Sequence, residues 1–242
     1  MNIENYIKAA EIKANNKFIK TLILAICSGI FLSLAGLAST VASSMIENYS
    51  ISKFMAAIIF PMGLILIIFM KTELFTGNSL MIIPVLNKNI KIKKMIRNWL
   101  IVYIGNLIGS IIVAYLISET PLVDKLNDTF INIANNKVNL EFKESLILGI
   151  FCNLLVCTSV YLAGVAKSNM EKIIVIFIPV FIFIVLSFEH SVANMFSLSI
   201  GYILDNSIGL KDILLSNLLP VTIGNILGGT ILGATIWYLR EQ

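Results

Sequence analysis

Ionisable side chains interrupt the apolar sequence at two places. Lys71 and Glu73 lie in the first, and Glu189 and His190, the only histidine of the chain, lie in the second. Ionisable residues in such surroundings are costly and usually functional. Imidazole is also the side chain whose charge changes most easily near neutral pH. We therefore expect His190 to take part in function rather than only in packing.

The two glutamates are equivalent in the sequence. Glu73 is followed by Asn78, and Glu189 is followed by Asn194 at the same spacing. This symmetry favours a structural role, in which each carboxylate accepts hydrogen bonds from backbone N–H groups that a helix break leaves free. A direct role of Glu189 in binding a solute is the alternative.

Two residues between Glu73 and Asn78 add further groups. Thr76 supplies a hydroxyl that could face His190 across a path, and Gly77 permits a tight, irregular turn. These residues predict a break in a helix over 71–78. The equivalent break is expected at 188–190.

A longer repeat follows each break. Residues 98–114 and 217–234 share a Gly-Asn-x-x-Gly pattern, which is formed by Gly105, Asn106 and Gly109 and by Gly224, Asn225 and Gly228. Small residues four positions apart let helices pack closely. The asparagines are expected to hydrogen-bond between helices, and Asn225 could instead donate into the path. The chain therefore consists of two homologous halves.

Composition predicts a membrane protein. The chain is 57% hydrophobic and 13% charged, with a mean hydropathy of +0.90, whereas a soluble domain carries about 25% charged residues. Most of its apolar runs approach the ~20 residues that a spanning helix needs. They lie at about 21–44, 54–70, 95–117, 146–166, 173–187 and 213–239. The second and fifth runs are short and continue beyond the breaks, so we predict six transmembrane helices with the second and fifth broken.

Three spans per half place the two halves in opposite orientations across the membrane. The predicted fold class is an all-α membrane protein with an inverted 3+3 repeat, in which discontinuous helices form a solute path near the midplane. We expect an amphipathic N-terminal segment at 1–20 and a single transmembrane domain at 21–242. Within that domain the repeats are expected at 21–118 and 144–240.

Lysine and arginine are concentrated in the N-terminal segment and at 87–97 and 167–172. The positive-inside rule then predicts that both termini are cytoplasmic, in a multi-pass protein of the plasma membrane. The N-terminal segment has the spacing of a helix that lies along the cytoplasmic interface. It is either a simple anchor or a flap over the cytoplasmic mouth.

Several classes of protein fit poorly. Cys27, Cys152 and Cys157 lie in predicted spans without a Cys/His cluster, so we expect packing roles, no metal and no cofactor. One histidine without HExxH or GxSxG argues against an enzyme. The breaks end in Thr-Gly-Asn78 and Val-Ala-Asn194 rather than Asn-Pro-Ala, which counts against an aquaporin-type facilitator of neutral solutes. The charge distribution gives no reason to expect nucleic acid as a partner.

Four segments resemble signatures of the formate/nitrite transporter family. They read ELFT at 73–76, GIFCNLLVC at 149–157, FEHSVANM at 188–195 and NLLPVTIGN at 217–225. The similarity covers essentially the whole chain. It implies a homopentamer with one pore in each protomer and an aquaporin-like protomer fold.

The resemblance also implies roles for individual residues. His190 would be the central histidine, Thr76 the threonine of the broken-helix loop, and Asn225 a polar residue of the pore. Lys143 matches the family's vestibule lysine. The apolar constrictions would fall near Phe60, Leu64, Phe75 and Phe183. Lys71 departs from the family pattern.

The substrates that the resemblance implies are small monovalent anions of weak acids. Hydrosulfide is preferred because the chain is similar overall to the hydrosulfide channels of the family, and formate and nitrite follow. A bare anion pays several kcal/mol to enter a dry constriction, so His190 between apolar constrictions would lend a proton while the anion crosses. A proton-coupled formate or nitrite transporter is the first alternative.

Overall fold

The computed structural model describes residues 3–205 and 207–241, and within them it contains helices and no strand. Five helical stretches are long and apolar enough to cross a membrane. They are α2 (Phe18–Ser43), α3 with α4 (Tyr49–Ile59 and Pro61–Phe69), α7 (Ile92–Ser118), α9 (Phe142–Val165) and residues 210–239, which hold α12 (Leu210–Asp212), the π-helix η2 (Ile213–Leu218) and most of α13 (Leu219–Glu241). The all-α membrane fold is thus confirmed.

The remaining helices are shorter. α10 (Asn169–Val185) is the counterpart of α3–α4 and has 17 residues. Short apolar helices follow each interruption, namely α5 (Phe75–Asn78), the 3₁₀ helix η1 (Ser79–Met81) and α6 (Ile82–Leu86) in the first half, and α11 (Ser191–Leu204) in the second. The count of six spans stays a prediction.

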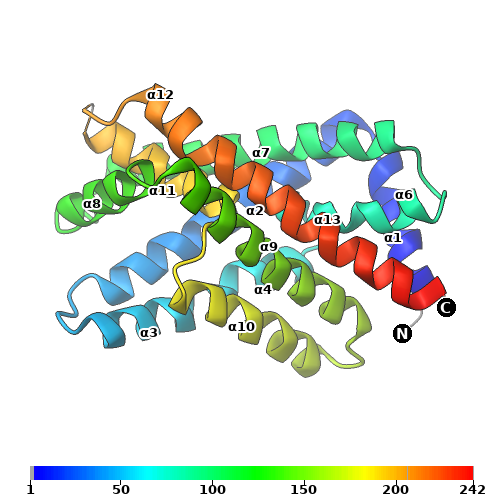
Figure 1. The fold of residues 1–242 in the computed structure, drawn as a ribbon. Coiled ribbons are helices and arrows are strands. Elements are labelled where there is room, and N and C mark those ends of the chain that lie inside the picture. The colour runs from blue at the N-terminus through cyan, green and yellow to red at the C-terminus, as the bar shows by residue number, and fades with distance from the viewer. Residues whose placement is uncertain (1–2, 206, 242) are drawn as a thin grey trace.

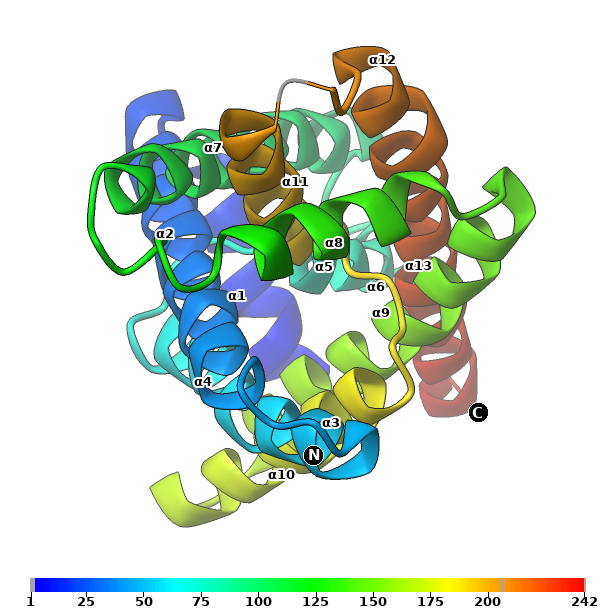
Figure 2. The ribbon, with the colours of Figure 1, turned by 90° about the vertical axis from the view of Figure 1, so that its left-hand side faces the viewer.

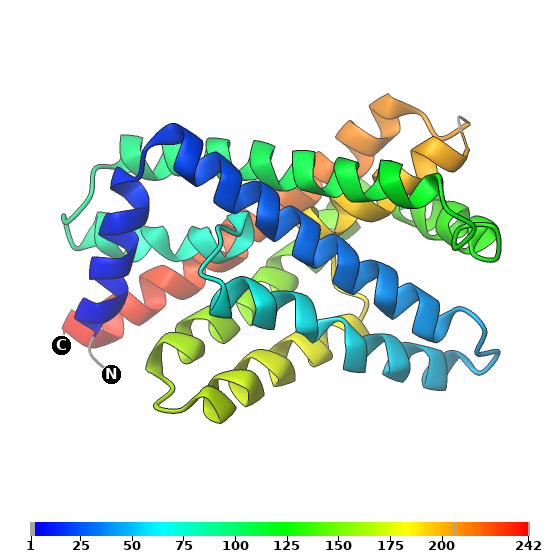
Figure 3. The same ribbon diagram turned by 180° about the vertical axis from the view of Figure 1, so that it is seen from behind.

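Two amphipathic helices cover the ends of the molecule. α1 (Ile3–Asn15) crosses the end that carries both termini (Figure 3). α8 (Asn127–Val138) lies across the opposite end (Figures 1 and 2). α1 precedes α2 and α8 precedes α9, so the inverted repeat contains an amphipathic helix in each half. Sequence reasoning expected the first of these helices and missed the second.

The glycine repeat brings the long helices together in pairs. A side chain at Gly109 of α7 would collide with the backbone carbonyl oxygen of Ile26 in α2, and one at Gly228 of α13 would collide with that of Ile150 in α9. The backbones therefore touch, as the small-residue pattern predicts. These two helix pairs form the frame that holds the interrupted helices.

The interruptions have matching backbone geometry. α4 ends at Phe69 and α5 begins at Phe75, while α10 ends at Val185 and α11 begins at Ser191. Lys71 and Ser187 adopt positive φ angles of 54° and 55°. In each half the next N–H bonds a carbonyl five residues earlier, Thr72 N to Ile67 O at 3.0 Å and Phe188 N to Phe183 O at 2.9 Å. In each half a single residue with left-handed backbone conformation therefore ends the helix and changes the direction of the chain.

Two sequence expectations at the first break need correction. Phe75–Asn78 was expected to be irregular but forms the helical turn α5, because an asparagine side chain of α7 satisfies its first N–H group. Gly77 was expected to make a tight turn. No glycine has a positive φ among the described residues, and a Cβ at Gly77 would lie 3.2 Å from Val160 of α9. Its small size serves helix packing.

Candidate solute pathway

A cavity of about 150 Å³ opens at the end where α8 lies. Its wall contains Ser39 of α2, Lys137 of α8 and Phe188 of the α10–α11 connection, and Phe60, Phe183 and His190 lie along it. We call this cavity the vestibule. It leads from the surface toward the interrupted helices.

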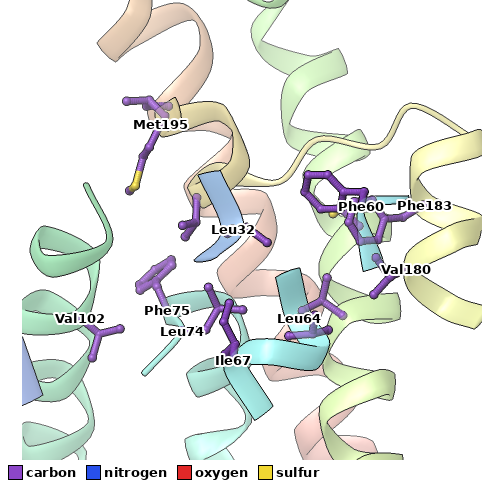
Figure 4. Packing of buried hydrophobic residues seen from close by; sticks show 14 of the residues in the cluster. Leu32, Phe60, Leu64, Ile67, Leu74, Phe75, Val102, Val180, Phe183 and Met195 are labelled. Atoms are coloured by element: carbon purple, nitrogen blue, oxygen red, sulfur yellow. The ribbon is translucent and has the colours of Figure 1, made fainter. Parts of the chain in front are cut away.

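A second void of about 10 Å³, which we call the central chamber, shares Phe60, Phe183 and His190 with the vestibule. Its other walls are aliphatic, and they are formed by Leu32, Leu64, Leu74, Val156 and Val180. The rings of Phe60 and Phe183 meet edge to face with their centroids 5.8 Å apart (Figure 4). These two rings separate the vestibule from the chamber.

His190 is 3% exposed and holds one tautomer. Its Nδ1 accepts the backbone N–H of Ala193 at 3.1 Å and so caps the N-terminus of α11. The proton of the neutral ring is therefore on Nε2, which lies 3.0 Å from Thr76 Oγ1. The ring of Phe183 stacks on the imidazole, with centroids 6.0 Å apart. His190 thus donates to Thr76, and the hydroxyl proton of Thr76 is left for another acceptor.

Glu189 precedes His190 in the chain, and its carboxylate accepts hydrogen bonds from three side chains. Lys137 Nζ lies 2.8 Å from Oε1, and Asn194 Nδ2 lies 2.5 Å from Oε2. Asn217 Nδ2 adds a bond of 3.3 Å. The carboxylate is buried, so these donors supply the compensation that a buried charge requires.

Glu73 has the same surroundings in the first half. Asn78 Nδ2 donates to Oε2 at 2.6 Å and also to Asn98 Oδ1 at 2.9 Å. Lys13 of α1 lies 3.3 Å from Oε2 and donates to Asn78 Oδ1 at 2.9 Å. Each amphipathic helix therefore places one lysine on the buried glutamate of its own half.

The backbone N–H groups that begin α5 and α11 donate to other side chains than expected. Phe75 N–H donates to Asn106 Oδ1 at 3.0 Å, and Ser191 N–H donates to Asn225 Oδ1 at 2.8 Å. The amide of Asn225 donates to the carbonyls of Gly149 and Glu189. The expectation that the glutamates take these backbone bonds is wrong, because the asparagines reach them from α7 and α13. The side-chain oxygen and nitrogen of Asn225 are both used in these hydrogen bonds, and Asn225 lines neither cavity.

Five of the predicted pathway residues line neither cavity, namely Phe75, Thr76, Lys143, Glu189 and Asn225. Phe75 packs against Tyr103 and Trp99, with ring centroids 4.9 and 6.3 Å away, and Figure 4 shows it on the far side of Leu74 from Phe60. Leu74, which sequence reasoning missed, lines the chamber. It occupies the position after Glu73 that His190 occupies after Glu189, so the repeat itself pointed to it.

Lys143 is exposed in the first turn of α9, and the vestibule wall contains Lys137 instead. The sequence around Lys137 contains a pattern that could have predicted the helix carrying it. Phe130, Ala134 and Val138 recur at helical spacing around it, which is the pattern of an amphipathic helix. Lys71 is exposed at the first interruption, where its backbone makes the turn.

Comparison with known proteins matches this arrangement to one family. The family model described as formate/nitrite transporter matches residues 1–239. The formate channel FocA of Escherichia coli (strain K12) is 33% identical over 97% of this chain and 92% of its own length. A probable formate transporter of Methanothermobacter thermautotrophicus is 31% identical over 96% of this chain and 93% of its own length.

Solved structures agree. A pentameric formate channel with formate bound superposes with a TM-score of 0.81 at 29% identity, covering 93% of this chain and 97% of that one. A structure described as an FNT family ion channel gives 0.85 at 25% identity, covering 98% and 96%. These relatives are channels and transporters rather than enzymes. With its interrupted helices, its buried histidine and a family match along nearly its whole length, the chain belongs to the formate/nitrite transporter family.

Proposed function

We propose that the chain is a channel in the plasma membrane for small monovalent anions of weak acids, with both termini in the cytoplasm. One observation carries the proposal: buried His190, which is hydrogen-bonded to Thr76, lies where an open vestibule narrows to a small apolar chamber. The relatives named for formate make formate the first substrate to test. Nitrite follows, and hydrosulfide, which the sequence resemblance favoured, stays a prediction for the same assay.

Energetics explain the choice of weak acids. A bare anion in an apolar constriction loses its hydration, which costs several kcal/mol even after relaxation. A neutral acid avoids that cost. Protonating a carboxylate whose pKa is about 3.5 costs roughly 5 kcal/mol at pH 7, at about 1.4 kcal/mol per pH unit. An acid that titrates near pH 7 pays almost nothing, and chloride, the anion of a strong acid, has no such route.

The pair supplies hydrogen-bond donors where hydration is lost. His190 lines both cavities, and its Nε2–H, which donates to Thr76 Oγ1 at rest, is the donor that an anion in the chamber would meet. Protonation of His190 on Nδ1 would break the bond from Ala193 and place a cation at the N-terminus of α11, where the helix dipole disfavours it. The resting pair therefore acts as a neutral donor, and proton lending requires the cap to open first.

Lys137 takes the role that the resemblance gave to Lys143. It lies in the vestibule wall, and within residues 3–205 and 207–241 its ammonium group bonds only Glu189. An ammonium group has three donors, so the remaining ones can bind an entering anion. Below the vestibule, Phe60 with Phe183 forms the outer constriction, and Leu64 with Leu74 forms the inner one.

Two variants of one residue test the proposal. His190→Asn keeps a side-chain oxygen that can cap a helix but removes the titratable imidazole. His190→Phe removes the capping atom and the titratable group together. Formate, nitrite, hydrosulfide and chloride fluxes would be measured in liposomes from pH 5 to pH 8. We expect wild-type protein to conduct the weak-acid anions and exclude chloride, and we expect both variants to change the pH dependence of the flux. Chloride flux equal to formate flux, or unchanged selectivity and pH dependence in both variants, would contradict the proposal.

The named pentameric relative supports a homopentamer for this chain as well, with one pathway in each protomer. Native mass spectrometry of the purified protein in detergent measures the assembly directly. A mass of five protomers is expected, and a stable monomer or dimer that conducts formate would contradict it.

A further inference from the structure

The end of the molecule that carries both termini has one strongly basic corner. It is formed by the connection between α1 and α2 and by the loop between α6 and α7 (Figure 3). Lys94 Nζ donates to Asn15 Oδ1 at 2.5 Å, and an Arg97 guanidinium N–H donates to the carbonyl oxygen of Asn16 at 3.4 Å. The two segments therefore form one surface although they are far apart in the sequence.

This surface, which we call the basic corner, has a large excess of positive charge. All of its cations are exposed, and they are Lys17, Lys20, Lys88, Lys91, Lys93, Lys94 and Arg97. The sequence of residues 1–20 and 87–97 contains only two carboxylates, Glu4 and Glu11. Lys94 and Arg97 donate to neutral oxygens of Asn15 and Asn16, so these bonds leave both charges uncompensated.

The basic corner lies at the start of two helices that are long and apolar enough to span a membrane, where a lipid headgroup layer is expected. Lys17 directly precedes α2 and Lys91 directly precedes α7, and both helices are long enough to span a membrane. Exposed apolar side chains stand between the cations, 50% exposed at Phe18 and 54% exposed at Ile92. Cations that alternate with apolar residues beside a spanning helix match an interface with headgroups above and acyl chains below.

The positive-inside rule explains an excess of lysine at this end but not its concentration in one corner. The other connection at the same end, residues 166–172 from the end of α9 into the first turn of α10, carries only Lys167 and Lys172 and includes Glu171. Binding of a soluble acidic partner would account for the cations but not for the exposed apolar side chains that flank them. We propose that the basic corner binds the headgroups of anionic phospholipids in the adjacent leaflet.

Purified full-length protein in vesicles of phosphatidylcholine with phosphatidylglycerol tests the proposal. Spin-labelled analogues of both lipids report the relative association of each with the protein. The patch variant is K88Q/K91Q/K93Q, which leaves Lys94 and Arg97 on their asparagines. The matched control is K125Q/K167Q/K211Q, which removes the same charge from exposed lysines elsewhere.

Wild-type protein is expected to prefer phosphatidylglycerol, and 1 M salt is expected to weaken the preference. Each lysine near a charged leaflet changes association roughly fivefold, so the patch variant should lose at least fivefold in preference while the control keeps it. An equal loss in both variants, or no loss in the patch variant, would overturn the proposal. A corner that binds a soluble acidic protein would give the second of these results. Protease accessibility of the termini confirms that the variants keep their orientation.

Discussion

Removal of Lys137 tests how each half holds its buried glutamate. Lys137 is 20% exposed and Glu189 is 7% exposed, and their charged atoms lie 2.8 Å apart. Breaking a buried ion pair from one side costs about 3–5 kcal/mol, because an uncompensated charge remains. Lys137→Met should lower the free energy of unfolding by about 3 kcal/mol, which is the lower limit of that range. The loss stays at this limit because Asn194 and Asn217 still donate to Glu189.

Lys13 is the matched control within the same molecule. Its side chain is 34% exposed and lies 3.3 Å from Glu73. Glu73 is buried, but water reaches the ammonium group of Lys13, so Lys13→Met should lower the free energy of unfolding less than Lys137→Met does, by at most about 1 kcal/mol. The two substitutions are chemically identical and differ only in their structural surroundings.

Thermal unfolding in detergent, followed by the fluorescence of Trp99 and Trp237, measures both effects. For a chain of this size 1 kcal/mol corresponds to a change in Tm of roughly 2–4 °C. Lys137→Met should lower Tm by about 6–12 °C and Lys13→Met by at most about 4 °C. The double variant Lys137→Met with Glu189→Gln should be more stable than Lys137→Met alone, because a neutral amide no longer needs a cation.

Equal shifts for Lys137→Met and Lys13→Met would refute the argument that burial sets the strength of each pair. A double variant that is no more stable than Lys137→Met alone would refute the argument that an uncompensated carboxylate is the cause.

Three further predictions concern backbone strain, close packing and the constriction. Lys71→Gly should raise Tm by roughly 2–4 °C, because a non-glycine residue at positive φ costs about 1 kcal/mol; a lower Tm would mean that the lysine side chain makes a stabilising contact. Gly109→Ala should lower Tm sharply because its Cβ meets backbone, whereas Gly36→Ala should not, because its nearest neighbour is a ring atom at 3.4 Å. Phe60→Ala should raise the flux of acetate relative to formate, and Phe75→Ala should reduce stability without that change, since only Phe60 lines the cavities; equal acetate flux in both variants would contradict the assignment.

The sequence by itself determined the class and the symmetry of the protein. Apolar runs of spanning length exclude a soluble fold, and the repeated Glu and Gly-Asn patterns fix which parts of the two halves correspond. They also place the histidine beside an interruption. These features are local in the chain, so periodicity and spacing reveal them directly.

The tertiary structure decided which side chains meet. Lys13 and Lys137 reach the buried glutamates from helices that lie 60 and 52 residues away in the sequence, and no local pattern encodes such a contact. Leu74 and Phe75 are adjacent and both apolar, yet only Leu74 lines the chamber, because successive residues at the start of a helix point in different directions. The tautomer of His190 depends on the N–H of Ala193, which becomes a free donor only once α11 begins at Ser191. Contacts between distant segments and side-chain directions at helix ends are properties of packing, and this is why the fold alone could set them.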